Sequence, residues 1–251
     1  MPDDYASAFR SEHAAARYDD TTYDPQSYDS FIGGLQAAWL REFVTTEFPG
    51  ESPALHDYAC GTGRIIEALT GAVSEAHGYD VSADMLAAAS RKGLPAQLHL
   101  VQARPTPVSL DGSPGRPLLV TMFRLLLNAP DPVRRDSLRF AADLLRQSEH
   151  AVLVVNNHGN RWSLRSLRRL RPLADGDWFH SLSTRDVRRL AGEHGLVVRR
   201  GHGFGLLPRG LHATAARGLA RRVDRWAAGQ RWLAPVSIDI AYVVTPARSD
   251  P

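Results

Sequence analysis

From Ala54 onward, short apolar runs alternate with segments of helical periodicity, and this alternation constrains the fold more than any other feature of the chain. Strands joined by crossover helices build a parallel sheet with helices on both faces. The predicted strands are Ala54–Tyr58, Ala76–Asp80, Gln97–Gln102, Leu118–Phe123, Ala151–Asn156, Val197–Gly201 and Ile238–Thr245. The predicted helices between them are Arg64–Thr70, Ala83–Lys92, Pro132–Arg146 and Thr184–His194. The sequence therefore predicts an α/β fold with a seven-stranded, mostly parallel sheet.

Three further segments complete this prediction. Residues 28–48 carry apolar side chains at helical spacing, which predicts a helix packed beside the sheet. Ser183 and Asp186 have the spacing of a capping box at the start of the last predicted helix. Residues 105–117 are rich in Pro, Gly and Ser, and the strand pattern resumes after them, so we expect a surface loop rather than a domain linker.

Composition excludes several classes of protein. Cys60 is the only cysteine, so an internal disulfide and a cysteine zinc site are ruled out, and we interpret this residue as a packing residue. Residues 1–10 carry Asp3 and Asp4 and no apolar run; we therefore expect a cytoplasmic protein with neither a secretory signal nor a membrane-inserted segment.

The basic residues are almost all arginine, and the formal net charge is only +3 although the isoelectric point is about 9.3. We therefore expect no nucleic-acid partner. Arginine is concentrated in residues 160–171 and again at Arg221, Arg222 and Arg225. Such groups are typical either of solvated helix faces or of a dock for an anionic substrate or headgroup. The sequence leaves both interpretations open, and the oligomeric state with them.

The strongest local signal is the run Leu55-His56-Asp57-Tyr58-Ala59-Cys60-Gly61-Thr62-Gly63-Arg64, a strand that enters a glycine turn and then a helix. Such a turn lets a ligand approach the backbone closely. The third glycine of the dinucleotide fingerprint is replaced by Ile66. Asp57 would repel a pyrophosphate, whereas its carboxylate suits a ligand that carries an ammonium group. Asp80 follows the glycines by about twenty residues, which is the distance at which nucleotide-binding α/β folds carry an acidic residue that accepts the ribose hydroxyls.

The segments DYACGTGR and GYDVSADML together resemble the first two motifs of class I S-adenosylmethionine-dependent methyltransferases. This resemblance implies a Rossmann-like fold and S-adenosylmethionine as cofactor, with S-adenosylhomocysteine as product. It places Asp57, Ala59, Gly61 and Gly63 around the amino-acid portion, Arg64 near its carboxylate, Asp80 on the ribose, and Val81 with Met85 against the adenine. Val81 and Met85 also suit an ordinary core.

Two positions depart from the family pattern. Ala103-Arg104 replaces the usual acidic residue after the third strand, and the start of the fourth strand is apolar up to Thr121. Gln102 or backbone groups would then contact the adenine. The resemblance divides a single domain, 1–251, into an N-terminal arm and helix (1–50), a cofactor-binding half (51–160) and a substrate-side half (161–251). The polar arm with Tyr18, Tyr23 and Tyr28 resembles the lid of related enzymes, or it is a surface arm.

Candidate chemistry lies at the carboxyl ends of the strands, where open parallel sheets bind ligands. His158 is the candidate base, Tyr18 and Tyr23 are candidate catalytic residues of the lid, and a structural histidine in a loop is the alternative for His158. The candidate substrate contacts are Tyr28, Arg124, Asn128, Asn156 and His180. Asn128, Asp131 and Asn156 are too scattered to suggest a metal site.

The leading functional hypothesis is a methyltransferase that acts on oxygen or nitrogen of a small molecule in specialised or sugar-related metabolism. The arginine groups would suit an anionic substrate. One alternative keeps the cofactor and cleaves it differently, as in an intramolecular cyclisation to azetidine-2-carboxylate and methylthioadenosine. Another alternative is a binding module without catalysis.

Overall fold

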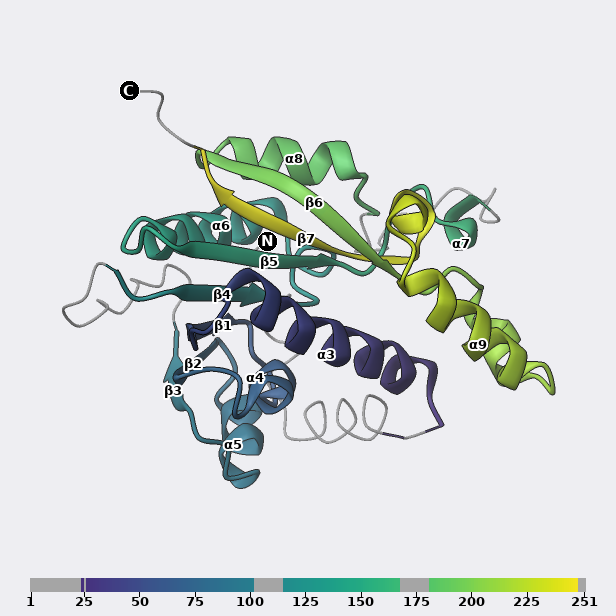
Figure 1. The fold of residues 1–251 in the computed structure, drawn as a ribbon, viewed down its shortest axis with the longest axis horizontal. Coiled ribbons are helices and arrows are strands. Elements are labelled where there is room, and N and C mark those ends of the chain that lie inside the picture. The colour runs from purple at the N-terminus through teal and green to yellow at the C-terminus, as the bar shows by residue number, and fades with distance from the viewer. Residues whose placement is uncertain (1–23, 25, 102–114, 168–180, 248–251) are drawn as a thin grey trace.

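The computed structural model describes residues 24, 26–101, 115–167 and 181–247. Within them the strands form a seven-stranded sheet in the order β3-β2-β1-β4-β5-β7-β6 (Figure 1). The strands are β1 (Ala54–Tyr58), β2 (Glu75–Asp80), β3 (Gln97–Leu100), β4 (Leu118–Met122), β5 (Ala151–Asn157), β6 (Leu196–Phe204) and β7 (Asp239–Pro246). The first five pair in parallel, and β7 runs antiparallel to both β5 and β6. The predicted mostly parallel sheet is confirmed.

Helices cover both faces of the sheet, as predicted. One apolar cluster joins the sheet to α3 (Tyr28–Glu47), α4 (Arg64–Leu69) and α5 (Ala83–Arg91). The other joins it to α6 (Asp131–Leu145) and α8 (Thr184–Gly192). The central strands β1, β4 and β5 are buried along their whole length, as expected of strands inside a parallel sheet that helices cover on both faces. Ser183 and Asp186 form the predicted capping box of α8, with both reciprocal hydrogen bonds present.

Sequence patterns placed some boundaries incorrectly. β3 ends at Leu100 rather than at residue 102. β6 runs on to Phe204, three residues past the predicted end, through an Arg, Gly and His segment without strand-like composition. Pairing with β7 imposes this extension, since Phe204 lies opposite Asp239 across an antiparallel register that contains one irregularity.

The chain between β6 and β7, residues 205–238, forms an arginine-rich segment that we call the β6–β7 insert. It contains η1 (Arg209–Ala213), α9 (Arg217–Ala228) and η2 (Arg231–Val236), and α9 projects beyond the end of the sheet (Figure 1). Asp224 of α9 is fully buried; its carboxylate accepts the backbone N–H groups of Leu206 and Leu207 and meets the Nε2 atom of His212 at 2.9 Å. These bonds fix the insert at its base.

A short helix, α7 (Leu164–Leu167), follows β5. No helix in the described ranges combines the length and apolar character needed to cross a membrane.

Antiparallel β7 matters for the location of a site. Because it runs against β5, its first residues lie beside the carboxyl end of β5, with Asn156 opposite Ala241 and Asn157 opposite Ile240. The loops after β1, β2, β4 and β5, the start of β7 and the first turn of α3 therefore meet at one edge of the sheet.

Candidate functional site

The turn after β1 has the backbone that a closely bound ligand requires. Ala59, Gly61 and Gly63 all have positive φ, of 58°, 55° and 81°. Ala59 takes this left-handed conformation although it carries a Cβ, which is uncommon. At Gly63 a Cβ would lie 2.6 Å from Leu94 Cδ1, so glycine is needed for space as well as conformation. Cys60 is buried, and burial raises the pKa of its thiol well above the ordinary value, as expected of a packing residue.

Asp57 lies beneath this turn and is almost completely buried. Its Oδ1 accepts a hydrogen bond from the hydroxyl of Thr121 on β4 at 2.7 Å. Its Oδ2 is buried and has no hydrogen-bond partner among the described residues. Burial raises the pKa of Asp57 to about 7, an effect that the Thr121 hydroxyl and Arg64 reduce. A buried carboxylate oxygen without a partner is costly, so this atom marks a position suited to a donor from a ligand.

Asp80 ends β2 and supports the turn from the other side. Its two carboxylate oxygens accept backbone N–H groups from Gly61 at 2.8 Å and Ser82 at 2.9 Å. Burial raises its pKa, while these backbone bonds lower it. Each oxygen keeps capacity for a second donor. Val81 is half-buried and Met85 is buried at the start of α5, directly after this carboxylate.

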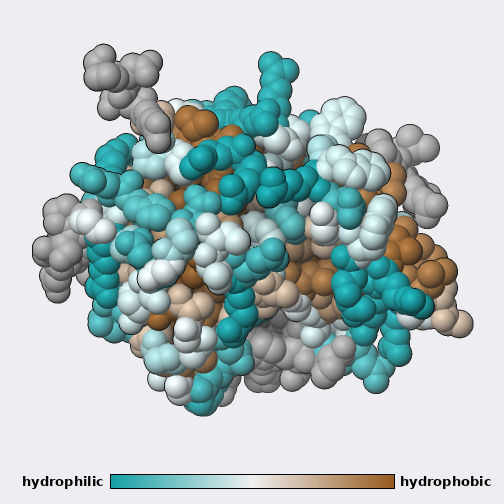
Figure 2. Space-filling view, in the orientation of Figure 1, coloured by the Kyte–Doolittle hydropathy of each residue, from teal (hydrophilic) through white to brown (hydrophobic). Residues whose placement is uncertain are grey.

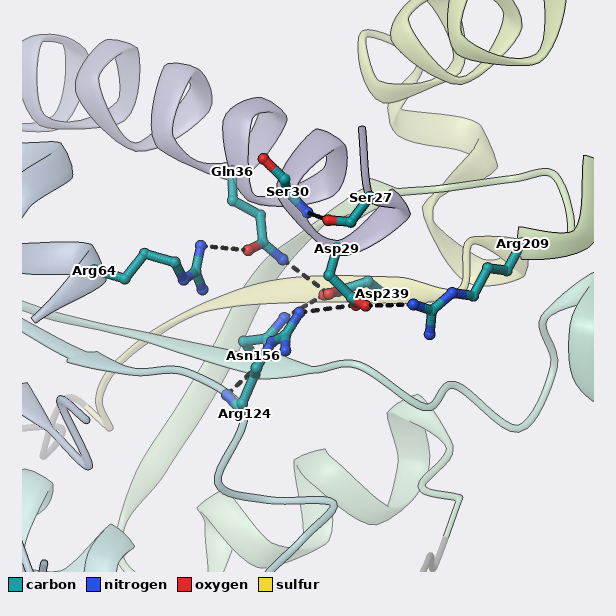
Figure 3. A network of polar contacts seen from close by, with 9 residues as sticks. All are labelled: Ser27, Asp29, Ser30, Gln36, Arg64, Arg124, Asn156, Arg209 and Asp239. Atoms are coloured by element: carbon teal, nitrogen blue, oxygen red, sulfur yellow. Dashed lines mark hydrogen bonds and ion pairs between the residues drawn. The ribbon is translucent and has the colours of Figure 1, made fainter. Parts of the chain in front are cut away.

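A polar network crosses the carboxyl edge beside the turn (Figure 3). Its centre is Asp239, the buried first residue of β7, which accepts hydrogen bonds from the side-chain amides of Gln36 on α3, at 2.8 Å, and Asn156 on β5. Burial raises the pKa of Asp239 to about 7 against the opposing effect of Arg124 and Arg64. The resemblance placed Arg64 near a cofactor carboxylate; here its Nη1 donates to Gln36 Oε1 at 3.1 Å.

The outer part of this network is a carboxylate between two arginines. Asp29, in the first turn of α3, pairs with Arg124 after β4 at 3.1 Å and with Arg209 of the insert at 2.9 Å (Figure 3). Arg124 has φ of 57°, a strained value for a residue with a Cβ, and its backbone N–H donates to Asn156. The buried Asn156 side chain holds this backbone conformation through that hydrogen bond. Strained backbone of this kind is characteristic of functional sites, and the Arg124 side chain reaches α3 from it.

The remaining predicted site residues lie around this edge or outside the described part. Asn128 donates to the Arg124 carbonyl and borders a hollow of about 360 Å³ between α6 and α8. His158 is half-buried directly after β5, and Tyr28 packs edge-on against His212 of the insert. Four predicted residues lie outside the described residues: Tyr18, Tyr23, Gln102 and His180.

Sequence reasoning missed Gln36, Asp239, Asp29 and Arg209. Two of them carried a signal: Gln36 stands on the apolar face of α3 among buried residues, and Asp239 interrupts the apolar run of the last strand. A buried polar residue within an apolar pattern indicates a partner elsewhere in the fold. Asp29 and Arg209 gave no such signal, because charged side chains are common on any protein surface.

Within the described ranges, no group of three or more His, Cys, Asp and Glu side chains is placed to hold a metal ion. The candidate site consists of the glycine turn with Asp57 and Asp80, and beside it the arginine-rich network around Asp239.

Comparisons with known proteins identify the fold. Residues 56–148 match a family model described as a methyltransferase domain. A search of curated protein sequences found no match. The solved structures that resemble the chain include magnesium protoporphyrin IX methyltransferase from Synechocystis with bound SAH (S-adenosylhomocysteine), at TM-score 0.63 and 14% identity over 96% of this chain and 98% of that one.

Two other structures resemble the fold to a similar degree. One is an S-adenosylmethionine-dependent methyltransferase from Clostridium acetobutylicum, at TM-score 0.58 and 13% identity over 93% of this chain and 98% of that one. The other is a SAM-dependent methyltransferase from Leishmania major, at TM-score 0.57 and 16% identity over 93% and 82% of the two chains. The chain thus has the Rossmann-like class I methyltransferase fold, and its residues 56–148 match the model of the methyltransferase domain.

Proposed function

We propose that this protein is a cytoplasmic S-adenosylmethionine-dependent methyltransferase, working as one domain, that methylates an oxygen or nitrogen atom of a small anionic molecule. One observation carries the cofactor assignment: a buried carboxylate oxygen of Asp57 without a partner among the described residues lies beneath a left-handed glycine turn. A phosphate ligand would be repelled there, whereas an ammonium group would supply the missing donors.

The residues of the site fit this cofactor. Asp57 would accept from the amino group of its methionine portion, directly or through water, and the turn from Ala59 to Gly63 would pass beside it. Asp80 would accept ribose hydroxyls with the oxygen capacity that remains beyond Gly61 and Ser82. The carboxyl ends of β1 and β2 and the start of α5 supply these groups together. When bound, the cofactor provides an electrophilic methyl group on a sulfonium.

Arg124 and Arg209 support the anionic acceptor. They converge on the single carboxylate of Asp29 at the carboxyl edge, next to Asn156, and about a quarter of the Arg124 side chain is exposed. Two guanidinium groups aimed at one carboxylate are equally suited to a carboxylate or phosphate of a substrate. Asp29 would then keep the arginines in position until an acceptor anion replaces it.

Product analysis tests the function. The purified protein is incubated with S-adenosylmethionine, with and without a panel of carboxylated and phosphorylated acceptors, and the nucleoside products are identified. Adenosylhomocysteine that accumulates only with an acceptor supports methyl transfer. Methylthioadenosine without any acceptor would instead assign the cofactor-cleaving alternative, and the absence of both products with intact cofactor binding would assign a binding module.

Asp80→Ala tests the cofactor site by calorimetric titration with adenosylhomocysteine. Loss of hydrogen bonds to a charged group costs about 1.5–3 kcal/mol, so the affinity should fall roughly ten- to a hundredfold. Asp84→Ala, on the first turn of α5, is the matched control, and its affinity should stay near that of the wild type. Equal affinity of the Asp80 variant and the wild type would contradict the ribose role.

His158 is our proposed base for an acceptor whose nucleophilic atom carries a proton. It follows β5, and Gly159 lets its loop lie against Leu127 of the loop after β4, where a Cβ would come within 2.6 Å of Leu127 Cδ2. His158→Gln keeps polarity but removes the titrating group, so kcat should fall about 10²–10⁴-fold with little change in cofactor affinity. A glutamine variant with the wild-type rate and pH profile would show that His158 is structural.

A further inference from the structure

The β6–β7 insert exposes an unusual concentration of large apolar side chains. Eight large hydrophobic residues are exposed among the described residues, and six of them belong to the insert or to the segment beside it. In the insert they are Leu211, Leu219, Trp226 and Trp232, with exposed fractions of 40%, 67%, 57% and 69%. Trp162 and Leu164 lie in the adjacent segment, since Asn160 donates to the carbonyls of Pro235 and Ser237 in η2 and just after it.

Helix α9 carries two of these side chains, Leu219 and Trp226, and turns them outward. Ala220, Asp224 and Ala227 are buried and form its inner face. Leu219 and Trp226 are seven residues apart, so they share one outer stripe, displaced from the inner face. The stripe is therefore set by the packing of the helix, and no described part of the chain covers it.

The charge of the insert is strongly one-sided. Residues 205–238 contain six arginines and one acidic residue, Asp224. Asp224 is fully buried and bonded to His212, so the surface of the insert presents arginines without acidic side chains of its own. Figure 2 shows strongly hydrophilic and apolar surface side by side over α9.

The contacts that α9 makes with the rest of the protein account for only some of the arginines of the insert. The guanidinium groups of Arg221 and Arg225 lie 5.2 and 5.8 Å from the ring centre of Phe31 on α3. Arg221 also donates to the Gln26 carbonyl. These arginines attach the insert to the start of α3. Arg222 and Arg231 are exposed, and the exposed tryptophans take no part in these contacts.

We infer that this surface docks the protein on an anionic phospholipid membrane. Indole and leucine side chains on one face of a helix with arginine beside them are the features of segments that lie in the membrane interface. A second copy of the chain is disfavoured as the occupant, because two such surfaces would bring their arginines together. An acidic protein is also disfavoured, because the apolar side chains project from a convex helix and can enter the headgroup layer, whereas protein partners anchor side chains in pockets.

Vesicle binding by the full chain tests this inference without any turnover, so its result is independent of the proposed methyl transfer. The protein is sedimented with vesicles of phosphatidylcholine and with vesicles that also contain phosphatidylglycerol. We expect binding to the anionic vesicles, weakened by salt, and a shift of tryptophan emission to shorter wavelength as the indoles leave water. Binding that is equal on both vesicles, or absent on both, would overturn the inference.

Two sets of variants separate the apolar and the ionic contributions. Leu219→Ser, Trp226→Ser and Trp232→Ser combined should lower partitioning more than tenfold, whereas Leu100→Ser with Val197→Ser, exposed elsewhere, should leave it unchanged. Arg222→Gln with Arg231→Gln should reduce partitioning about fivefold for each arginine, because a basic residue near an anionic surface contributes about 1 kcal/mol. Arg185→Gln with Arg188→Gln on α8 is the matched control.

The arginine variants keep the test decisive if the triple serine variant is not folded by circular dichroism. Equal losses in the insert and control variants would show nonspecific adsorption and reject the surface. Binding to polyglutamate with no binding to anionic vesicles would assign an acidic protein as the partner and overturn the membrane assignment.

Discussion

At the scale of single residues, Asp57 combines a cost in stability with the proposed role in binding. Its pKa is about 7 in the folded protein, raised chiefly by burial, against 3.8 for the ordinary group. Between these values the folded chain binds more protons than the unfolded chain, so stability falls as pH rises from about 4 to about 7. Above that range the carboxylate is ionised in both states, and the full cost of its burial is present.

Asp57→Asn tests whether the carboxylate lowers stability and is needed for cofactor binding. The amide can still accept from Thr121, and its N–H₂ group takes the place of the unpartnered oxygen, so the apoprotein should gain up to a few kcal/mol of unfolding free energy at pH 8. The gain should shrink as the pH falls from 7 toward 4 and approach zero below pH 4, where the wild-type carboxyl becomes protonated in both states. Urea unfolding at several pH values measures it.

The same variant should bind adenosylhomocysteine at least tenfold more weakly, because its amide cannot pair with an ammonium group. Asp239 remains in both proteins and contributes the same slope to each, so the difference between the two curves isolates Asp57. A variant that is less stable at every pH, or that binds as tightly as the wild type, would contradict this account of Asp57.

At the scale of elements, α8 shows how local sequence alone can define a helix boundary. The Ser183 hydroxyl accepts the Asp186 N–H, and the Asp186 carboxylate accepts the Ser183 N–H at 2.9 Å. Behind this cap, Val187, Leu190 and Ala191 are buried against the sheet. Sequence analysis identified this element correctly because every interaction that starts it lies within four residues.

Ser183→Ala removes one half of the cap. We expect a loss of about 1 kcal/mol in unfolding free energy, since the Asp186 N–H loses its acceptor. Ser90→Ala, at an exposed position within α5, serves as the control and should not destabilise the protein. Equal unfolding midpoints for Ser183→Ala and the wild type would show that water replaces the hydroxyl without cost.

At the scale of the whole molecule, sequence reasoning predicted the contacts between residues that are close along the chain and missed those between residues that are far apart. The glycine turn, Asp57 and Asp80 fall within a short stretch, and their order on strand, turn and helix could be predicted. The contact between Gln36 and Asp239 spans 203 residues, and that between Asp29 and Arg124 spans 95. No local pattern encodes such pairs. The contact of Gln36 with Asp239 follows from the antiparallel return of β7, which brings its first residue beside β5, and the contact of Asp29 with Arg124 follows from the packing of α3 at the carboxyl edge.

The base of the β6–β7 insert has a consequence for how this fold can diversify. The two ends of the insert are joined by a hydrogen bond of 2.7 Å from the Ile238 N–H to the Gly205 carbonyl, immediately beyond the paired strands β6 and β7. A segment that leaves and re-enters a hairpin at one point can be lengthened, shortened or exchanged by recombination without shifting the register of the sheet. A protein of this fold could therefore acquire a new acceptor or a new membrane target by replacing this segment, while the cofactor turn after β1 is inherited unchanged.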